Sequence, residues 1–175
     1  MPATKISLDN AKTEKLFYFV ATVVVYRESD GRCLIIKRDE REKVHPGKWG
    51  IPGGKLEWND LDIEHPTRIN NGVLDYVGAL EDLLKREAKE EANVEIGGDF
   101  AYITSVAFVR PDETPVMMVE MAAKYLGGEV VLERGGFTDY AWVNAEEIQA
   151  YDCIGDIKGE VAKAISILNR VAVIS

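Results

Sequence analysis

The chain has 175 residues, of which 46% are hydrophobic and 29% are charged, a composition typical of a globular protein that needs neither disulfides nor metal to fold. Thirty acidic residues against 21 basic ones give a formal net charge of −9, which repels polyphosphate backbones and anionic lipids, so we expect no nucleic-acid partner and no membrane partner. Two histidines and two cysteines without a CxxC pair exclude a zinc site and a disulfide framework, so any metal should be a hard cation bound by oxygen.

The first part of the chain predicts a β-hairpin. The apolar residues 16–26 are rich in Val, Phe and Tyr and predict a strand, and they are too few to cross a bilayer. The turn residues 29–31 lead into a second apolar run at 33–36. Residues 1–15 are polar and contain no signal-peptide core, so we expect a cytoplasmic protein.

The next segments are irregular. Residues 49–57 contain Pro52, Gly53 and Gly54, which allow only a short strand or turn. Residues 59–77 show no clean periodicity and predict a long loop without secondary structure. Such a loop is either functional or a tolerated surface insertion, and the sequence does not decide between these two readings.

The clearest helix is predicted at residues 78–92, where Leu80, Leu83, Leu84 and Ala88 repeat at helical spacing. The rest of the chain predicts strands at 102–110, 115–125 and 140–143, a short helix at 145–151 and a terminal helix at 156–170. Strands early and late with helices between and after them predict an α+β fold, an α/β/α sandwich with a mixed β-sheet flanked by helices.

The predicted central helix carries three glutamates, Glu87, Glu90 and Glu91, at positions i, i+3 and i+4. This spacing places their carboxylates on one side of the helix, where their repulsion costs a few tenths of a kcal/mol per pair on an exposed surface. A divalent cation between them would remove that cost, and carboxylates without histidine suit Mg²⁺ or Mn²⁺. Taken alone, a Glu- and Lys-rich helix is usually a solvated face.

With the glycine-rich segment 47–57, this helix resembles the signature of the Nudix family of pyrophosphohydrolases. The signature runs Gly, five residues, Glu, seven residues, Arg-Glu, an aliphatic residue, any residue, Glu-Glu, any residue, Gly and an aliphatic residue. The positions that match it are Gly54, Arg86, Glu87, Glu90, Glu91 and Val94. The flanking segments also look like those of the family, so the resemblance covers about residues 17–151.

The match is interrupted. Gly54 and Arg86 are 32 positions apart where the signature expects 14, a surplus of 18 positions that fits an insertion at 59–77. The isolated Glu of the signature falls on Asp60 or on Gly78, depending on the direction of counting. Asn93 replaces the late glycine, a mild change because Asn tolerates the left-handed conformation.

The resemblance implies a single Nudix domain over 1–175, with a core at 16–151, an insertion loop at 59–77 and a C-terminal helix at 156–170. It implies hydrolysis of a diphosphate linkage in a nucleoside diphosphate derivative by water, with Mg²⁺ or Mn²⁺ as the cofactor. The implied metal ligands are Glu87, Glu90, Glu91 and the backbone of Gly54, the implied catalytic residues are Glu87, Glu90 and Arg86, and the implied substrate-binding residues are Arg38, Gly53 and Gly54. Glu87 is the first candidate for the general base, and Glu133 or Asp139 on a later loop are alternatives.

Other roles stay open at this point. Trp49, Trp58 and Trp142 could stack on a base, although core packing is the simpler reading of Trp142. His45 and Cys33 are expected to be structural. The insertion could cover the pocket or build a contact between two copies, so a homodimer is among the expected partners. The alternative functions are a non-catalytic nucleotide or nucleotide-sugar sensor and an isomerase of isoprenoid diphosphates, for which Cys33 is a poor candidate.

Overall fold

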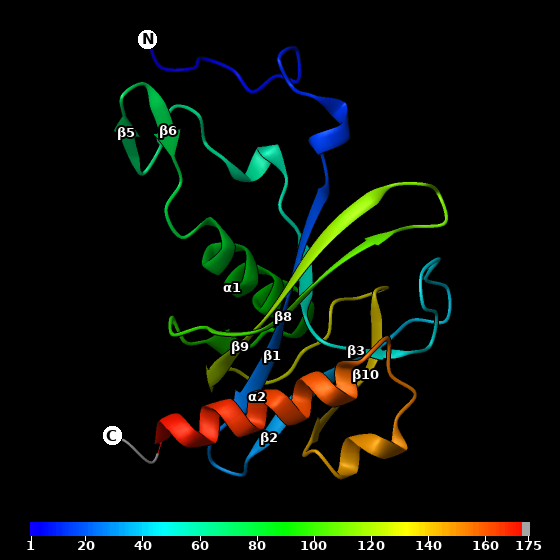
Figure 1. Cartoon of the computed structure of the whole chain (residues 1–175). Coiled ribbons are helices and arrows are strands. Elements are labelled where there is room, and N and C mark those ends of the chain that lie inside the picture. Colours follow the sequence, from blue (N-terminus) through cyan, green and yellow to red (C-terminus); the bar gives the residue numbers. More distant parts are fainter. Residues whose placement is uncertain (173–175) are drawn as a thin grey trace.

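The computed structural model describes residues 1–172 (Figure 1). Its strands are β1 (Tyr18–Arg27), β2 (Arg32–Arg38), β3 (Trp49–Gly50), β4 (Gly53–Lys55), β5 (Arg68–Asn70), β6 (Val73–Asp75), β7 (Glu95–Ile96), β8 (Ala101–Val109), β9 (Pro115–Gly127) and β10 (Phe137–Val143). Its helices are α1 (Ala79–Ala92) and α2 (Ile157–Ala172), with 3₁₀ turns η1 (Thr13–Lys15), η2 (Trp58–Asp60) and η3 (Glu147–Ala150). Residues 173–175 of the expected domain lie outside the described residues.

A mixed sheet forms the middle layer, with the main strand order β10-β2-β1-β9-β7. β1 pairs in parallel with β9 from Tyr18↔Val116 to Tyr26↔Lys124, and its pairing with β2 and β4 is antiparallel. The short strand β4 places Gly53 opposite Thr22 and Gly54 opposite Ala21. The glycine segment is therefore fixed to the central strand of the sheet.

The two helices cover opposite faces of this sheet, as the alternation along β1 requires. Ala21, Val23 and Val25 face the core beneath α1, whereas Val24 and Tyr26 face the core beneath α2. Figure 1 shows α2 crossing in front of the strands and α1 behind them. The predicted α+β sandwich with a mixed sheet is confirmed.

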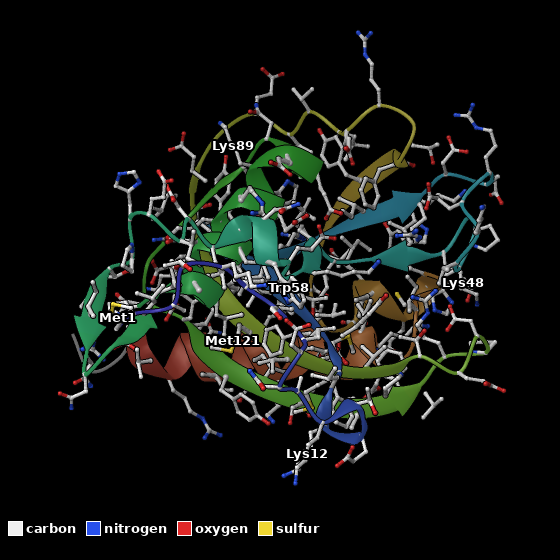
Figure 2. All side chains as sticks on the ribbon, turned by 90° about the horizontal axis from the view of Figure 1, so that it is seen from above. Met1, Lys12, Lys48, Trp58, Lys89 and Met121 are labelled. Carbon is white, nitrogen blue, oxygen red and sulfur yellow. The ribbon has the colours of Figure 1, made fainter. Side chains whose placement is uncertain are left out.

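The predicted elements match the observed ones within a few residues, except in the insertion. The segment expected to be a loop without secondary structure at 59–77 contains the end of η2 and the antiparallel hairpin β5–β6. Asn71 and Gly72 adopt φ of 49° and 83° at the tip of this hairpin. Consecutive left-handed residues of the Asn-Gly type build a tight hairpin turn, so that part of the prediction was wrong. Figure 2 shows Met1 beside this hairpin.

No helix in the described range 1–172 combines the length and the apolar character needed to cross a bilayer.

Two glutamates lie buried between the sheet and α2. Glu120 on β9 is 3% exposed and Glu160 on α2 is 8% exposed, and Oε2 of each has no hydrogen-bond partner. Burial, together with the hydrogen bond and charge of Glu120 and the charge of Asp156, raises the pKa of Glu160 to about 9. The pair therefore holds a proton at neutral pH, because two adjacent buried carboxylates cannot both ionise.

This pair makes folding stability depend on pH. Because the pKa of Glu160 is raised from 4.5 to about 9, the unfolded chain loses this proton first, and stability declines as pH rises between these values. We expect Glu160→Gln to be more stable than the parent at pH 8 by about 1–3 kcal/mol, with a smaller gain at pH 5. Thermal melts from pH 5 to pH 9 measure this, with exposed Glu64→Gln as the charge control. Parallel pH curves for parent and Glu160→Gln would contradict a shared proton.

Candidate active site

Helix α1 is fixed at both ends and along one face. It begins after Gly78 with φ of 85° and ends at Asn93 with φ of 55°, as expected for a left-handed C-terminal residue. Leu83, Leu84, Ala88 and Ala92 are buried against the sheet. Glu87 and Glu91 lie one turn apart beside this face, and both are directed toward β4.

Glu91 is held by the glycine segment. The amide of Gly53 donates a hydrogen bond to Oε2 of Glu91 at 3.0 Å, across 38 positions of the sequence. Burial raises the pKa of Glu91 to about 8 despite this hydrogen bond, and the negative charges of Glu87 and Glu133 raise it further. Burial and the neighbouring negative charges therefore outweigh the hydrogen bond from Gly53 and the positive charge of Arg38.

Glu87 lies directly against Gly54. A Cβ atom added at Gly54 would overlap the carboxyl group of Glu87, so only glycine leaves room for it. Burial raises the pKa of Glu87, opposed by Arg86 and assisted by the negative charges of Glu90 and Asp60. The glycine segment thus receives both carboxylates, Glu91 at Gly53 and Glu87 at Gly54.

Glu90 lies farther out. Its side chain is 59% exposed, and its Oε1 is 4.0 Å from Nε of Arg86. It still borders a cavity of about 440 Å³ beside the two glycines. The residues that line this cavity are Gly54, Lys55, Glu57, Asp60, Arg86, Glu87 and Glu90.

The start of the insertion supplies a further carboxylate. Asp60 accepts hydrogen bonds from Nη1 of Arg86 and from the amide of Glu57, the latter at 2.7 Å. Although burial acts to raise it, these partners lower the pKa of Asp60, so the residue is ionised. Of the two candidates for the isolated acidic position, Asp60 makes the contact with Arg86, and Gly78 has no side chain to make one.

Asp60→Asn is expected to reduce activity several-fold while changing the free energy of unfolding by less than about 1 kcal/mol, because a partly exposed ion pair contributes little to stability. The pair matters for position, since Arg86 also donates to Oε1 of Glu87 at 3.3 Å. Steady-state kinetics and urea unfolding of Asp60→Asn measure both effects, with exposed Asp62→Asn as the matched control. Equal kinetics of the two variants would remove the positioning role.

The other charged candidates, Arg38, Glu133 and Asp139, are not among the residues that line the cavity. Arg38 donates to the carbonyl of Val44 at 2.8 Å and to Glu42 at 2.5 Å, and it does not line the cavity, although its charge lowers the pKa of Glu91. Glu133 lies beside Glu91, because its amide donates to the Glu91 carbonyl at 3.0 Å and the charge of its side chain raises the pKa of Glu91. Asp139 lies exposed on β10, where it accepts from the amide of Tyr140.

Of the three tryptophans, Trp49 and Trp142 pack against other aromatic rings, whereas Trp58 is exposed. The ring of Trp49 packs edge-on against Tyr151, and the ring of Trp142 packs against Tyr125 and under the guanidinium of Arg27. Trp58 is 50% exposed in η2. Figure 2 shows it near the middle of the view, whereas Lys48 and Lys89 lie toward the periphery.

Neither His45 nor Cys33 lines the cavity. His45 lies exposed in a loop with φ of 53°. Cys33 is fully buried in the core beneath α2, where burial raises the pKa of its thiol to about 12, so it is an inert core residue as expected.

The donor set fits a hard divalent cation. Glu87 and Glu91 are carboxylates with raised pKa values that converge on a glycine backbone, and a cation would offset their burial and mutual repulsion. Within residues 1–172 no group of three or more His, Cys, Asp or Glu side chains is arranged to hold a metal ion by itself. The remaining ligands would have to be backbone carbonyls, water or substrate oxygens, which is how Mg²⁺ is usually held.

Comparison with known proteins finds one family model that matches part of the chain. A model of the NUDIX domain matches residues 17–66, which include Gly53 and Gly54 but end before α1. No curated protein matches the sequence. The MutT NUDIX hydrolase of Burkholderia pseudomallei superposes with a TM-score of 0.63 at 18% identity, over 85% of this chain and 98% of that one.

Two further solved structures have the same fold. The NUDIX domain of Shewanella oneidensis NrtR, complexed with ADP ribose, has a TM-score of 0.66 at 17% identity, over 92% of this chain and 96% of that one. The Ap4A hydrolase of C. elegans has a TM-score of 0.59 at 18% identity, over 87% of this chain and 98% of that one. The resemblance to the Nudix family is confirmed by the domain match and the fold, whereas the roles assigned to Glu87, Glu90 and Glu91 depend on the geometry described above.

Proposed function

We propose that this chain is a divalent-metal-dependent pyrophosphohydrolase that cleaves a diphosphate linkage in a nucleoside diphosphate derivative, a proposal supported by the NUDIX match at residues 17–66 and by the fold shared with Nudix hydrolases. The observation that carries this proposal is the convergence of Glu87 and Glu91 on Gly53 and Gly54. These residues are 33 to 38 positions apart in sequence and meet only through the pairing of β4 with β1 and the packing of α1 on the sheet.

Each residue of the site has a separate task in this proposal. The amide of Gly53 holds Glu91 as a metal ligand, and Glu87 faces the cavity as a ligand and as the candidate general base. Bound Mg²⁺ or Mn²⁺ would supply positive charge for the phosphate oxygens and acidify the attacking water. Arg86, held by Asp60, orients Glu87, and Glu90 lies at the rim. Glu133 is a second candidate for the base, because it lies beside Glu91, whereas Asp139 has no such support.

The acidic character of the chain supports a need for metal. The net charge is −9, and the cavity is lined by four carboxylates against one lysine and one arginine. A diphosphate cannot enter such a cavity unassisted, because like charges at short range repel strongly in a partly buried site. Metal and substrate would therefore bind together.

The substrate class is proposed with the help of the structural relatives. One is named as an Ap4A hydrolase and others as MutT proteins, which supports a small nucleotide with a phosphoric anhydride. We also propose one Nudix domain over residues 1–175 and action in the cytoplasm. A homodimer through the insertion stays a prediction that size-exclusion chromatography with light scattering can test.

The test is a phosphate-release screen over nucleoside triphosphates, ADP-ribose, dinucleoside polyphosphates and nucleotide sugars with Mg²⁺ or Mn²⁺. We expect turnover of at least one member that stops when EDTA is added. Turnover that continues at full rate in EDTA would contradict metal dependence, and no turnover of any member would favour the second candidate.

That second candidate is a sensor that binds a nucleotide or nucleotide sugar without cleaving it. The likeness to the NrtR NUDIX domain, which was crystallised with ADP ribose, supports it. Calorimetry would then find ADP-ribose binding in a chain that leaves the ligand intact. An isomerase of isoprenoid diphosphates is not supported, because Cys33 is buried in the core beneath α2 and neither it nor Cys153 lines the cavity.

A further inference from the structure

A second cavity of about 230 Å³ lies beside the first, between the insertion and α1. It is lined by Leu56, Asp60, Leu61, Thr67, Tyr76, Val77, Ala79, Asp82, Leu83 and Arg86. Asp60 and Arg86 also line the first cavity, so this ion pair stands between the two. A molecule with its diphosphate in the first cavity could extend past the pair into the second.

The insertion builds one wall of this cavity, and its own hydrogen bonds hold that wall in place. The hydroxyl of Tyr76 donates to the carbonyl of Asp62 at 3.1 Å, and the amide of Val77 donates to Oγ1 of Thr67 at 3.2 Å. These bonds join the two ends of the insertion on either side of the hairpin β5–β6, at the left of Figure 1. The cavity therefore depends on the insertion 59–77, by which the chain departs from the family signature.

The charges around the second cavity exclude a phosphate. Arg86 is its one cation among the described residues, and its guanidinium already donates to Asp60 and Glu87. Asp60 and Asp82 add two carboxylates, which repel an anion.

The remaining walls favour an uncharged ring. Most of the other lining residues are aliphatic, and the hydroxyl of Tyr76 already donates a hydrogen bond to the carbonyl of Asp62. A flat heterocycle would bury mainly apolar surface against these residues, whereas a sugar carries more hydroxyl groups than the few polar side chains there can pair, at a cost for each unpaired one.

We infer that the second cavity binds the heterocyclic base of the nucleotide substrate, so that the insertion selects for base-bearing diphosphates. This inference rests on the proposed function, because it assigns the diphosphate to the first cavity. The carboxylate of Asp82 at the cavity wall is an acceptor for an amino group on such a base.

Two valines provide a matched test. Val77 lines the cavity and is 58% exposed, and Val73 on β6 is 59% exposed and does not line it. Val77→Asp places a further carboxylate at the mouth of the cavity, whereas Val73→Asp makes the same chemical change elsewhere on the insertion. Both sites are exposed enough for the variants to fold, which thermal melts verify.

The measurement is calorimetric binding of AMP and of ribose 5-phosphate to the full chain with Mg²⁺. We expect the parent to bind AMP more tightly than ribose 5-phosphate. We also expect Val77→Asp to weaken AMP binding about tenfold while leaving ribose 5-phosphate within about twofold, and Val73→Asp to change neither. Equal affinity of the parent for both ligands, or equal AMP affinity of the two variants, would overturn the inference.

The same variants separate this inference from the proposed function. If the parent cleaves a nucleotide but KM for it is the same in Val77→Asp and Val73→Asp, the base assignment fails and the hydrolase stands. If the parent cleaves nothing but AMP binding falls only in Val77→Asp, the hydrolase fails and the base site stands.

Discussion

Glu91→Gln is expected to lower kcat by about two to four orders of magnitude, the scale of losing a group that holds a catalytic metal or stabilises charge in the transition state. The structural reason is the position of Glu91, whose Oε2 accepts the amide of Gly53 at 3.0 Å while its neighbours Glu87 and Glu133 are negative. Glutamine can still accept that hydrogen bond but cannot hold a cation through a charged oxygen. Glu87→Gln is expected to cause a loss of similar size.

The same substitution should make the metal-free protein more stable. The pKa of Glu91 is raised to about 8 from 4.5, so the folded chain loses stability as pH rises through this range, and a neutral side chain avoids that loss. Thermal melts in EDTA at pH 8 measure it beside steady-state kinetics. Glu95→Gln is the matched control, since Glu95 lies just past the same helix with its side chain 67% exposed. A Glu91→Gln variant that keeps full turnover would remove the proposed role.

Gly54→Ala is expected to lower kcat by about 10²-fold or more while changing the free energy of unfolding by less than about 1 kcal/mol. The three atoms nearest to its new Cβ all belong to the carboxyl end of Glu87, a flexible side chain that can move away. The fold then survives, but a displaced Glu87 no longer faces the cavity, and catalysis is sensitive to shifts of about 1 Å.

Gly53→Ala supplies the contrast. Its Cβ would meet backbone, the carbonyl of Ala21 and, at 2.7 Å, Cα of Thr22, so β4 would have to move away from β1. We expect a loss of about 1–3 kcal/mol in unfolding free energy together with the loss of activity. Urea unfolding of both variants measures the change in unfolding free energy, and steady-state kinetics measures the change in kcat. If Gly54→Ala lost stability as Gly53→Ala does, or kept full activity, the position assigned to Glu87 would be wrong.

Local patterns were sufficient to predict much of the fold and one half of the site. The spacing of Leu80, Leu83 and Leu84 predicted α1, and Asn93 was a sound end signal because it adopts the left-handed conformation. The motif also predicted that Glu87 and Glu91 share a side of the helix with the glycines nearby. Those features depend on neighbours within a few residues or on a known spacing.

Of the features that were missed, one had a local signal and the others depend on contacts between distant residues. The hairpin β5–β6 had a local signal, Asn71-Gly72 between Ile69 and Val73, which was read only as loop. Nothing local indicates that Asp60 reaches Arg86 or that Glu133 lies beside Glu91. These two contacts arise where distant parts of the chain meet at α1.

Binding of Mn²⁺, measured by the electron paramagnetic resonance signal of the free ion, shows without any turnover whether Glu87 and Glu91 hold a divalent cation against Gly53 and Gly54. We expect the parent and Glu95→Gln to bind Mn²⁺ alike, whereas Glu87→Gln and Glu91→Gln each weaken the binding by about tenfold or more. Unchanged Mn²⁺ affinity in Glu87→Gln and Glu91→Gln would show that these two carboxylates hold no cation.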